Sequence, residues 1–154
     1  MDKIMLNRAV KLAEEANAYE AKIHKCLLKP SALERETCMQ KFADCATAYK
    51  QIQKWLEAAQ MLDRALEYCD DKFNKCLLLN CSEAWEHAGF LDNAVRLYKQ
   101  YMMHLDRLFD LARAYEHMGK MYVDFEKSPE AIECFEKAAE LYKNDRKYLS
   151  ANKL

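Results

Sequence analysis

Glycine and proline are scarce in this sequence, with two residues of each among 154 positions. So few chain breakers exclude folds that depend on many β-turns, and they exclude the glycine-rich loops that cradle phosphates. The sequence also lacks an apolar run of the roughly 18 residues that a membrane-spanning helix requires. Neither sign of charge is in excess, because the formal net charge is −1. Non-specific nucleic-acid binding needs a basic excess, so we expect no nucleic-acid partner.

The motifs of common catalytic and metal sites are missing as well. No G-x-S-x-G, H-E-x-x-H or G-x-x-x-x-G-K-[ST] pattern occurs, and apart from loose carboxylate neighbours none of the four histidines pairs with a second ligand four residues away. We therefore expect no enzyme activity, no metal and no cofactor. The seven cysteines form no C-x-x-C pair, and several fall at apolar repeat positions, which predicts reduced, packed thiols in a cytoplasmic protein. Function is expected to reside in binding surfaces.

A repeated spacing of small and apolar residues runs through the chain. Three segments, beginning at Phe42, Leu78 and Tyr115, carry residues of matching type at successive offsets of 3, 1, 3, 9, 4 and 3, except that the second has Tyr101 where a small residue is usual. Offsets of three and four place residues on one helix face, and the gap of nine leaves room for a turn. A small residue at the third position of each segment lets two helices approach closely. Such a unit cannot bury its apolar face alone, so stacking of units completes the core.

This pattern resembles the tetratricopeptide motif. It predicts an all-α fold, a right-handed α-solenoid of tetratricopeptide-like helical hairpins with about seven to eight antiparallel helices. We expect a single domain over 1–154, with repeats at about 39–70, 75–106 and 112–143 and an unfinished fourth repeat at 146–154. The expected helices cover roughly 3–25, 34–51, 54–69, 72–88, 91–104, 107–125 and 129–143, followed by a last helix that begins near Arg146.

Several stretches carry a more specific resemblance. Residues 107–113 read Arg-Leu-Phe-Asp-Leu-Ala-Arg, residues 48–59 place an aromatic-lysine step before Trp55, residues 132–142 continue the likeness, and residues 150–153 read Ser-Ala-Asn-Lys. Together they resemble the soluble NSF attachment protein (SNAP) family, and the Leu-Lys-Pro link at 28–30 resembles its gamma branch. The likeness covers the N-terminal half of a usual family member. We therefore expect a fragment, or a member without its second half.

The resemblance implies an adaptor in vesicle-mediated transport and membrane fusion. SNAP proteins bind the SNARE four-helix bundle and recruit the NSF ATPase, which disassembles that bundle. The recruiting segment would lie in the C-terminal half that is absent here. The family's basic positions, which face an acidic bundle, fall on Lys50, Arg107, Arg113 and Lys153, and on Lys54 or its neighbour Gln53. A further one falls on Glu86-His87, which departs from the family's pattern.

The resemblance also implies a peripheral contact with the membrane surface. Leu27 and Leu28 lie between two lysines after the first expected helix, an arrangement that suits an anionic bilayer surface. A hydrophobic cap on the first repeat is the alternative interpretation of the same two leucines. We expect a cytoplasmic, peripherally membrane-associated protein. A terminal repeat without a neighbour exposes apolar surface, which predicts a homo-dimer through residues 146–154.

Two other functions fit the repeats. One is a generic tetratricopeptide scaffold for protein–protein interaction, and the other is a chaperone-peptide-binding module. A module of the second kind holds a peptide's terminal carboxylate with lysine and asparagine on successive inner helices. Ala43 and Thr47 stand where the first such pair is needed, whereas Asn80 and Arg113 fit later positions.

Overall fold

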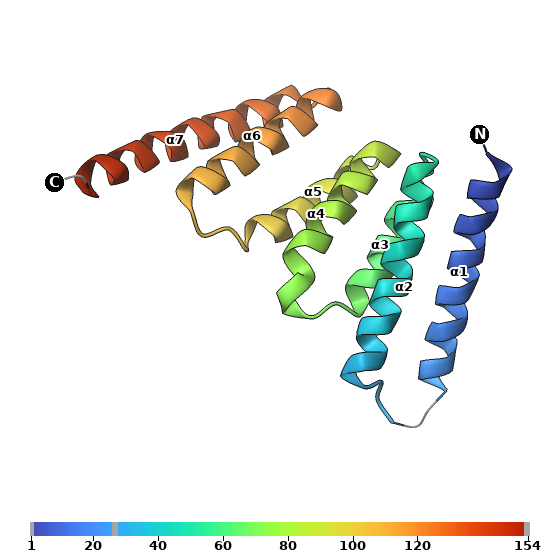
Figure 1. The fold of residues 1–154 in the computed structure, drawn as a ribbon. Helices are drawn as coiled ribbons and strands as arrows, with labels where there is room; N and C mark the ends of the chain where they lie inside the picture. The colour runs from blue at the N-terminus through green and yellow to red at the C-terminus, as the bar shows by residue number, and fades with distance from the viewer. Residues whose placement is uncertain (1, 26–27, 153–154) are drawn as a thin grey trace. The chain divides into compact units, whose positions relative to one another are not determined.

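The computed structural model describes residues 2–25 and 28–152, without the side chains of residues 71–73 and 151–152. In these ranges the chain forms α-helices and no strand. Seven helices follow one another along the chain (Figure 1): α1 (Lys3–His24), α2 (Ala32–Gln51), α3 (Trp55–Glu67), α4 (Asp71–Ala88), α5 (Leu91–Met102), α6 (Leu108–Asp124) and α7 (Ser128–Asn152).

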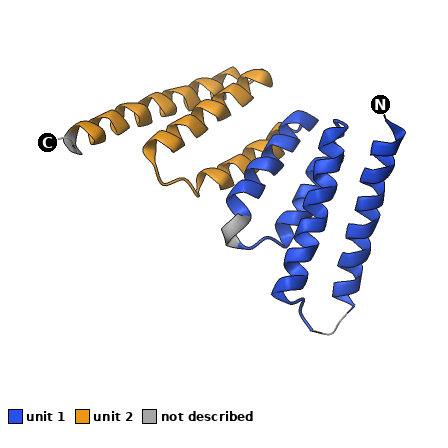
Figure 2. Ribbon diagram, viewed as in Figure 1, with its two compact units in different colours: residues 1–90 blue, residues 91–154 orange. Residues whose placement is uncertain are grey.

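The chain divides into two compact units (Figure 2). Unit 1 comprises residues 1–90 and contains α1 to α4, and unit 2 comprises residues 91–154 and contains α5 to α7. Within unit 1, α2 packs against both α1 and α3, and α3 packs against α4. Within unit 2, α6 packs along α7 and also contacts α5. The boundary falls inside the second predicted repeat, and the assignment of the three repeats stays a prediction.

The start of α2 is fixed by local hydrogen bonds. Ser31 Oγ accepts from the backbone N–H of Glu34, and Glu34 Oε1 accepts from the backbone N–H of Ser31, which completes a capping box. These hydrogen bonds lower the pKa of the Glu34 carboxyl. Pro30 precedes the cap, and because proline cannot continue a helix it separates α2 from the preceding segment.

The last helix differs from the sequence-based prediction. The sequence indicates a helix that ends near residue 143 and a separate one that begins near Arg146. The structure shows a single helix, α7, that continues through this point to Asn152. The intervening residues Asn144 and Asp145 are weak helix formers, but neither is a glycine or a proline, so nothing there ends the helix. The separate helix beginning near Arg146 was therefore a wrong prediction.

The turns that follow α2, α4 and α6 share one backbone geometry. Each contains one residue with a positive φ: Gln53 at 59°, Gly89 at 91° and Glu126 at 59°. Its N–H donates to the carbonyl three residues earlier, and the next N–H donates to the carbonyl five residues earlier. This is the Schellman arrangement, which satisfies the last carbonyls of a helix. The positive-φ residues are 36 and 37 residues apart, the same spacing as the three segments with repeated sequence.

The core of unit 1 centres on Phe42, which is fully buried. It belongs to a cluster formed by α1, α2 and α3, whose other members are Ala16, Ile23, Cys38, Ala65 and Tyr68. In unit 2, α6 and α7 approach each other closely at Gly119. A Cβ atom at this position would lie 2.7 Å from Cε1 of Phe135, so only glycine fits with the ring in its present place.

Candidate functional site

A shallow groove lies between α2 and α4 in unit 1. It encloses about 220 Å³ and is lined by Glu36, Met39, Gln40 and Ala43 from α2, with Cys76, Leu77 and Asn80 from α4. Met39 and Leu77 are partly buried and pack against the unit 1 core, so they form an apolar floor. Glu36, Gln40, Cys76 and Asn80 are exposed around it. We call this feature the α2–α4 groove.

The electrostatics of the α2–α4 groove are negative. Glu36 is the charged residue among those that line it, and Asp44 lies one turn further along α2, where its Oδ1 accepts from Nε2 of Gln40 at 2.8 Å. Thr47 is not available to a ligand as a donor, because its hydroxyl donates to the carbonyl of Ala43 at 3.1 Å. A terminal carboxylate needs a cation, and no lysine or arginine lines the groove. The groove therefore suits a positively charged segment.

A cluster of polar side chains beside the unit 1 core connects α1 with α3. The Tyr68 hydroxyl donates to Oε2 of Glu20 at 2.6 Å, and Arg64 forms an ion pair with the other oxygen of the same carboxylate. Because the Tyr68 hydroxyl donates its proton to Glu20, its oxygen accepts a hydrogen bond from Nε2–H of His24, 2.7 Å away. We call these four residues the Glu20 cluster. It joins the first helix to the third, and so keeps α2 enclosed between its two neighbours.

Unit 1 contains both buried and exposed thiols. Cys38, Cys45 and Cys81 are fully buried, whereas Cys76 is exposed at the groove itself. Burial raises the pKa of Cys38, and it raises the pKa of Cys45 to about 11. A thiol with a raised pKa holds its proton and reacts slowly. The cysteines that the structure describes are free rather than disulfide-bonded, as the sequence predicts, and Cys26 lies outside the described residues.

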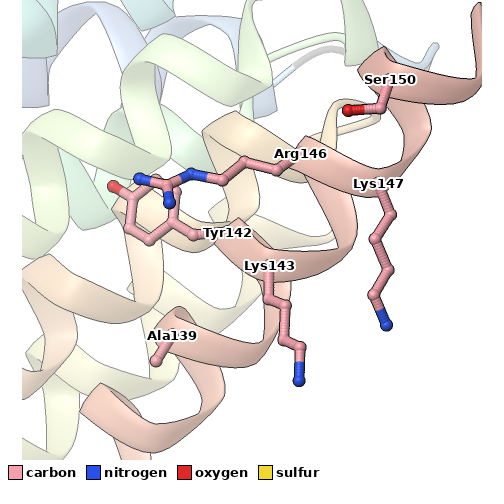
Figure 3. Close-up of a pocket in the computed structure, with 6 residues that line it drawn as sticks. All are labelled: Ala139, Tyr142, Lys143, Arg146, Lys147 and Ser150. Atoms are coloured by element: carbon pink, nitrogen blue, oxygen red, sulfur yellow. The ribbon is translucent and has the colours of Figure 1, made fainter.

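A second surface feature lies on α7 in unit 2. Residues of this one helix line a hollow of about 620 Å³ (Figure 3): Ala139, Tyr142, Lys143, Arg146, Lys147 and Ser150. Tyr142 anchors the helix, because its hydroxyl donates to Oε2 of Glu116 at 3.1 Å. Burial and the Glu116 carboxylate together raise the pKa of Tyr142. Lys143 and Lys147 extend away from the helix, while Arg146 reaches back toward Tyr142 (Figure 3).

The predicted site residues of unit 1 lie at its loops. Lys50 is on the last turn of α2 and Lys54 directly precedes α3, so both belong to the same Schellman turn and both are half-buried. The backbone N–H of Lys54 donates to the carbonyl of Tyr49 at 2.9 Å, which gives this residue a structural role. Leu28 is 83% exposed after α1, and Leu27 lies outside the described residues.

The predicted site residues of unit 2 are exposed on α6. Arg107 is at the N-cap position without a side-chain cap, and Arg113 lies with its guanidinium 5.9 Å from the centre of the Phe109 ring. Lys153 lies outside the described residues. Of the four described basic residues, Lys50 and Lys54 belong to unit 1 and Arg107 and Arg113 belong to unit 2, and their role as one binding site stays a prediction.

Most of the residues that line these features were not predicted from the sequence. Ala43 and Asn80 were predicted at inner positions of the repeats, and the structure places both in the α2–α4 groove. Glu36, Met39 and Gln40 were not predicted, although their offsets of 7, 4 and 3 from Ala43 indicate the same helix face. Among the described residues, no group of three histidine, cysteine, aspartate or glutamate side chains could hold a metal ion, and no helix is long and apolar enough to cross a membrane.

The chain was compared with known families, proteins and structures. No family model matches it, and no curated protein matches it. Solved structures do: MamA MSR-1 C2 has a TM-score of 0.52 at 17% identity, covering 87% of this chain and 69% of that one. BtubC from P. vanneervenii has a TM-score of 0.53 at 16% identity, with 87% and 57% covered. A further structure of MamA has a TM-score of 0.50 at 17% identity, with 92% and 82% covered.

These neighbours are tetratricopeptide-like helical proteins, so the predicted all-α fold of tetratricopeptide-like hairpins is confirmed. Identities this low speak for the fold alone. The resemblance to the SNAP family was wrong, because the structures that match are MamA and BtubC and no family model matches. The physical reason for this error is that the fold itself requires small and aromatic residues at hairpin positions, whichever family has that fold. The SNARE, NSF and membrane roles lose their basis with the resemblance.

Proposed function

We propose that this chain is a scaffold for protein–protein interaction and that the α2–α4 groove receives a segment of a partner protein. The observation that carries the proposal is the groove itself: exposed polar side chains surround an apolar floor between two helices of the repeat fold. The fold neighbours support a scaffold role in general. Hydrophobic anchoring with a few placed polar groups is the usual composition of a binding cleft.

The partner segment follows from the chemistry of the groove. Met39 and Leu77 offer an apolar floor for one aliphatic or aromatic side chain of the segment. Glu36 and the nearby Asp44 attract a lysine or arginine next to that anchor. Complementary charge mainly speeds association and selects partners, and salt weakens it. We therefore expect a segment with an apolar anchor beside one or two cations.

Selection from a random peptide library displayed on phage tests the proposal with the full chain as bait. We expect enrichment of peptides that combine lysine or arginine with an aliphatic or aromatic residue. The dissociation constant of a selected peptide is then measured by fluorescence anisotropy. Ala43→Trp fills the groove and Glu36→Lys reverses its charge, so each is expected to weaken binding at least about tenfold, or about 1.4 kcal/mol.

Glu15→Lys is the matched control for the charge reversal. Glu15 is exposed on α1, away from the residues that line the groove, and the change in net charge is the same. We expect this variant to bind the peptide as the wild type does. Peptides whose affinity survives Ala43→Trp unchanged would bind elsewhere, and the groove would then lose its proposed role.

A further inference from the structure

One exposed face of α7 carries a regular stripe of residues. Its members are separated alternately by four and three residues, so they follow one line along the helix. All six are exposed, and we call them the α7 stripe: Ile132, Glu136, Ala139, Lys143, Arg146 and Ser150. The residues that α7 buries against α6 occupy other positions, among them Ala131, Cys134 and Ala138. Ile132 is 57% exposed, which leaves an apolar side chain uncovered at one end of the stripe.

Charge is distributed unevenly along this face. Glutamates at 133, 136 and 140 lie in the N-terminal half of α7, and Lys143, Arg146 and Lys147 follow in the C-terminal half. Lys143 and Lys147 are one turn apart, where like charges repel each other. None of the three cations forms an ion pair with a described residue. The helix dipole does not explain them either, because its effect is confined to the last turn, which contains no basic residue.

We propose that the α7 stripe pairs antiparallel with the α7 stripe of a second copy of this chain. The stripe is symmetric about position 141, so one antiparallel register superposes it on itself. In that register Glu136 faces Arg146 of the partner copy, Ala139 faces the partner copy's Lys143, and Ile132 faces the partner copy's Ser150. The two-fold axis makes each contact twice. The acidic half of each helix then lies on the basic half of the other.

The antiparallel direction follows from the charges. A parallel pair would place cation on cation and carboxylate on carboxylate, whereas the antiparallel pair forms two Glu136–Arg146 contacts of opposite charge. Ala139 lies close to the two-fold axis, where a small side chain lets the helices approach and lets the Lys143 stem lie over it. A contact of this kind uses the same patch on both copies, so it closes at the dimer.

Sedimentation velocity of the full chain tests this pairing. One helix pair is smaller than a standard interface, so we expect monomer to convert to dimer between about 10 and about 300 μM. Arg146→Glu and Glu136→Lys each place like charges in contact, and each is expected to remain monomeric over this range. The double variant Glu136→Lys/Arg146→Glu restores opposite charges and is expected to dimerise within about threefold of the wild-type dissociation constant.

Arg8→Glu is the control, because Arg8 is exposed on α1 and the charge change matches that of Arg146→Glu. It is expected to leave the dissociation constant unchanged, and circular dichroism checks that every variant keeps its helices. Higher salt is expected to weaken the dimer. A chain that stays monomeric throughout overturns the proposal, as does a dimer that both single reversals leave intact or one that the double variant fails to restore.

Discussion

Unit 1 and unit 2 are built from similar helices but are held together differently. In unit 1, close packing around Phe42 is supplemented by the Glu20 cluster, whose hydrogen bonds join α1 to α3. In unit 2, α6 and α7 approach each other closely at Gly119, which lies against the Phe135 ring. In unit 1, directional hydrogen bonds fix the spacing of the helices. In unit 2, the absence of a side chain at Gly119 permits the close spacing of α6 and α7. The two units should therefore respond to different substitutions.

Buried thiols make this comparison measurable. Cys45 and Cys81 are fully buried in unit 1, and Cys134 is 8% exposed in unit 2. A thiol reagent reaches them only when the surrounding helices open, so the labelling rate of each cysteine reports the opening of its own unit. The exposed Cys76 labels in the folded state and provides an internal reference.

The largest effect is expected from Phe42→Ala. The side chain is fully buried among three helices, and removing it leaves a cavity that costs about 3–5 kcal/mol. We expect denaturant unfolding to shift accordingly, with faster labelling of Cys45 and Cys81. Leu33→Ala is the control, because this side chain is 72% exposed. Equal acceleration at Cys134 would mean that the two units open as one and would end the comparison.

Gly119→Val is expected to destabilise unit 2, as Phe42→Ala destabilises unit 1. The new side chain collides with the Phe135 ring, and overpacking of this kind costs about 1–3 kcal/mol. Labelling of Cys134 should accelerate while that of Cys45 stays near the wild-type rate. The second-site change Phe135→Leu makes room and should restore part of the stability. A loss that Phe135→Leu does not reduce would show that the ring is not the cause.

Glu20→Ala tests how much the Glu20 cluster stabilises unit 1. It removes the carboxylate that accepts from Tyr68 and pairs with Arg64. Because Arg64 is 38% exposed and water can replace part of the interaction, we expect a loss of about 1 kcal/mol. The labelling rate of Cys45 reports this loss of stability, since the thiol of Cys45 contacts the carbonyl of Ala9 on α1. Glu15→Ala on the same helix serves as the control and should change little.

Substitutions in the Schellman turns after α2 and α6 are expected to have a smaller effect of opposite sign. Gln53 and Glu126 adopt the left-handed conformation without being glycine, so Gln53→Gly and Glu126→Gly should each stabilise the chain by about 0.5 kcal/mol after the entropy of glycine is deducted. Gly89→Ala has free space around the new Cβ but the same backbone, so it should cost about 1 kcal/mol. Thermal unfolding measures all three. A neutral Gly89→Ala would show that the turn can change its conformation.

The smallest effect at neutral pH is expected from Cys45. Burial raises its pKa from an ordinary value of 9.0 to about 11, so the folded chain keeps a proton that the unfolded chain loses. The contribution of this thiol to the free energy of unfolding is therefore fully present below pH 9 and is lost as the pH rises toward 11. Denaturant unfolding at several alkaline pH values measures the slope. Cys45→Ala should make that slope shallower, and an unchanged slope would assign it to other groups, such as the buried tyrosines.

The all-α fold and its helices could be predicted because the repeated spacing indicates which helix faces are apolar. The positive φ of Gln53 and Glu126 could not, because neither residue prefers the left-handed conformation and only the packing of the flanking helices imposes it. The continuity of α7 was missed because Asn144 and Asp145 resemble a helix end locally. Such a signal is weak beside the hydrogen bonds that a continuing helix forms.

The binding surfaces were less predictable than the fold. Ala43 and Asn80 could be placed on inner helices, but the groove also depends on Glu36 and Met39, whose exposure depends on how α2 and α4 each pack on α3. The error in family assignment has the same origin. Residues such as Gly119 are required wherever two helices approach closely, so they specify a hairpin and say little about its partners.

The recurrence of one turn geometry after α2, α4 and α6 has a consequence for how the chain folds. Each turn is closed by hydrogen bonds between residues three and five apart, so its formation requires almost no loop closure. Local contacts of this kind are made early and quickly, and chains rich in them fold fast. Such a chain has several equivalent points at which folding can begin. A substitution that slows one of them should leave the others able to start the process.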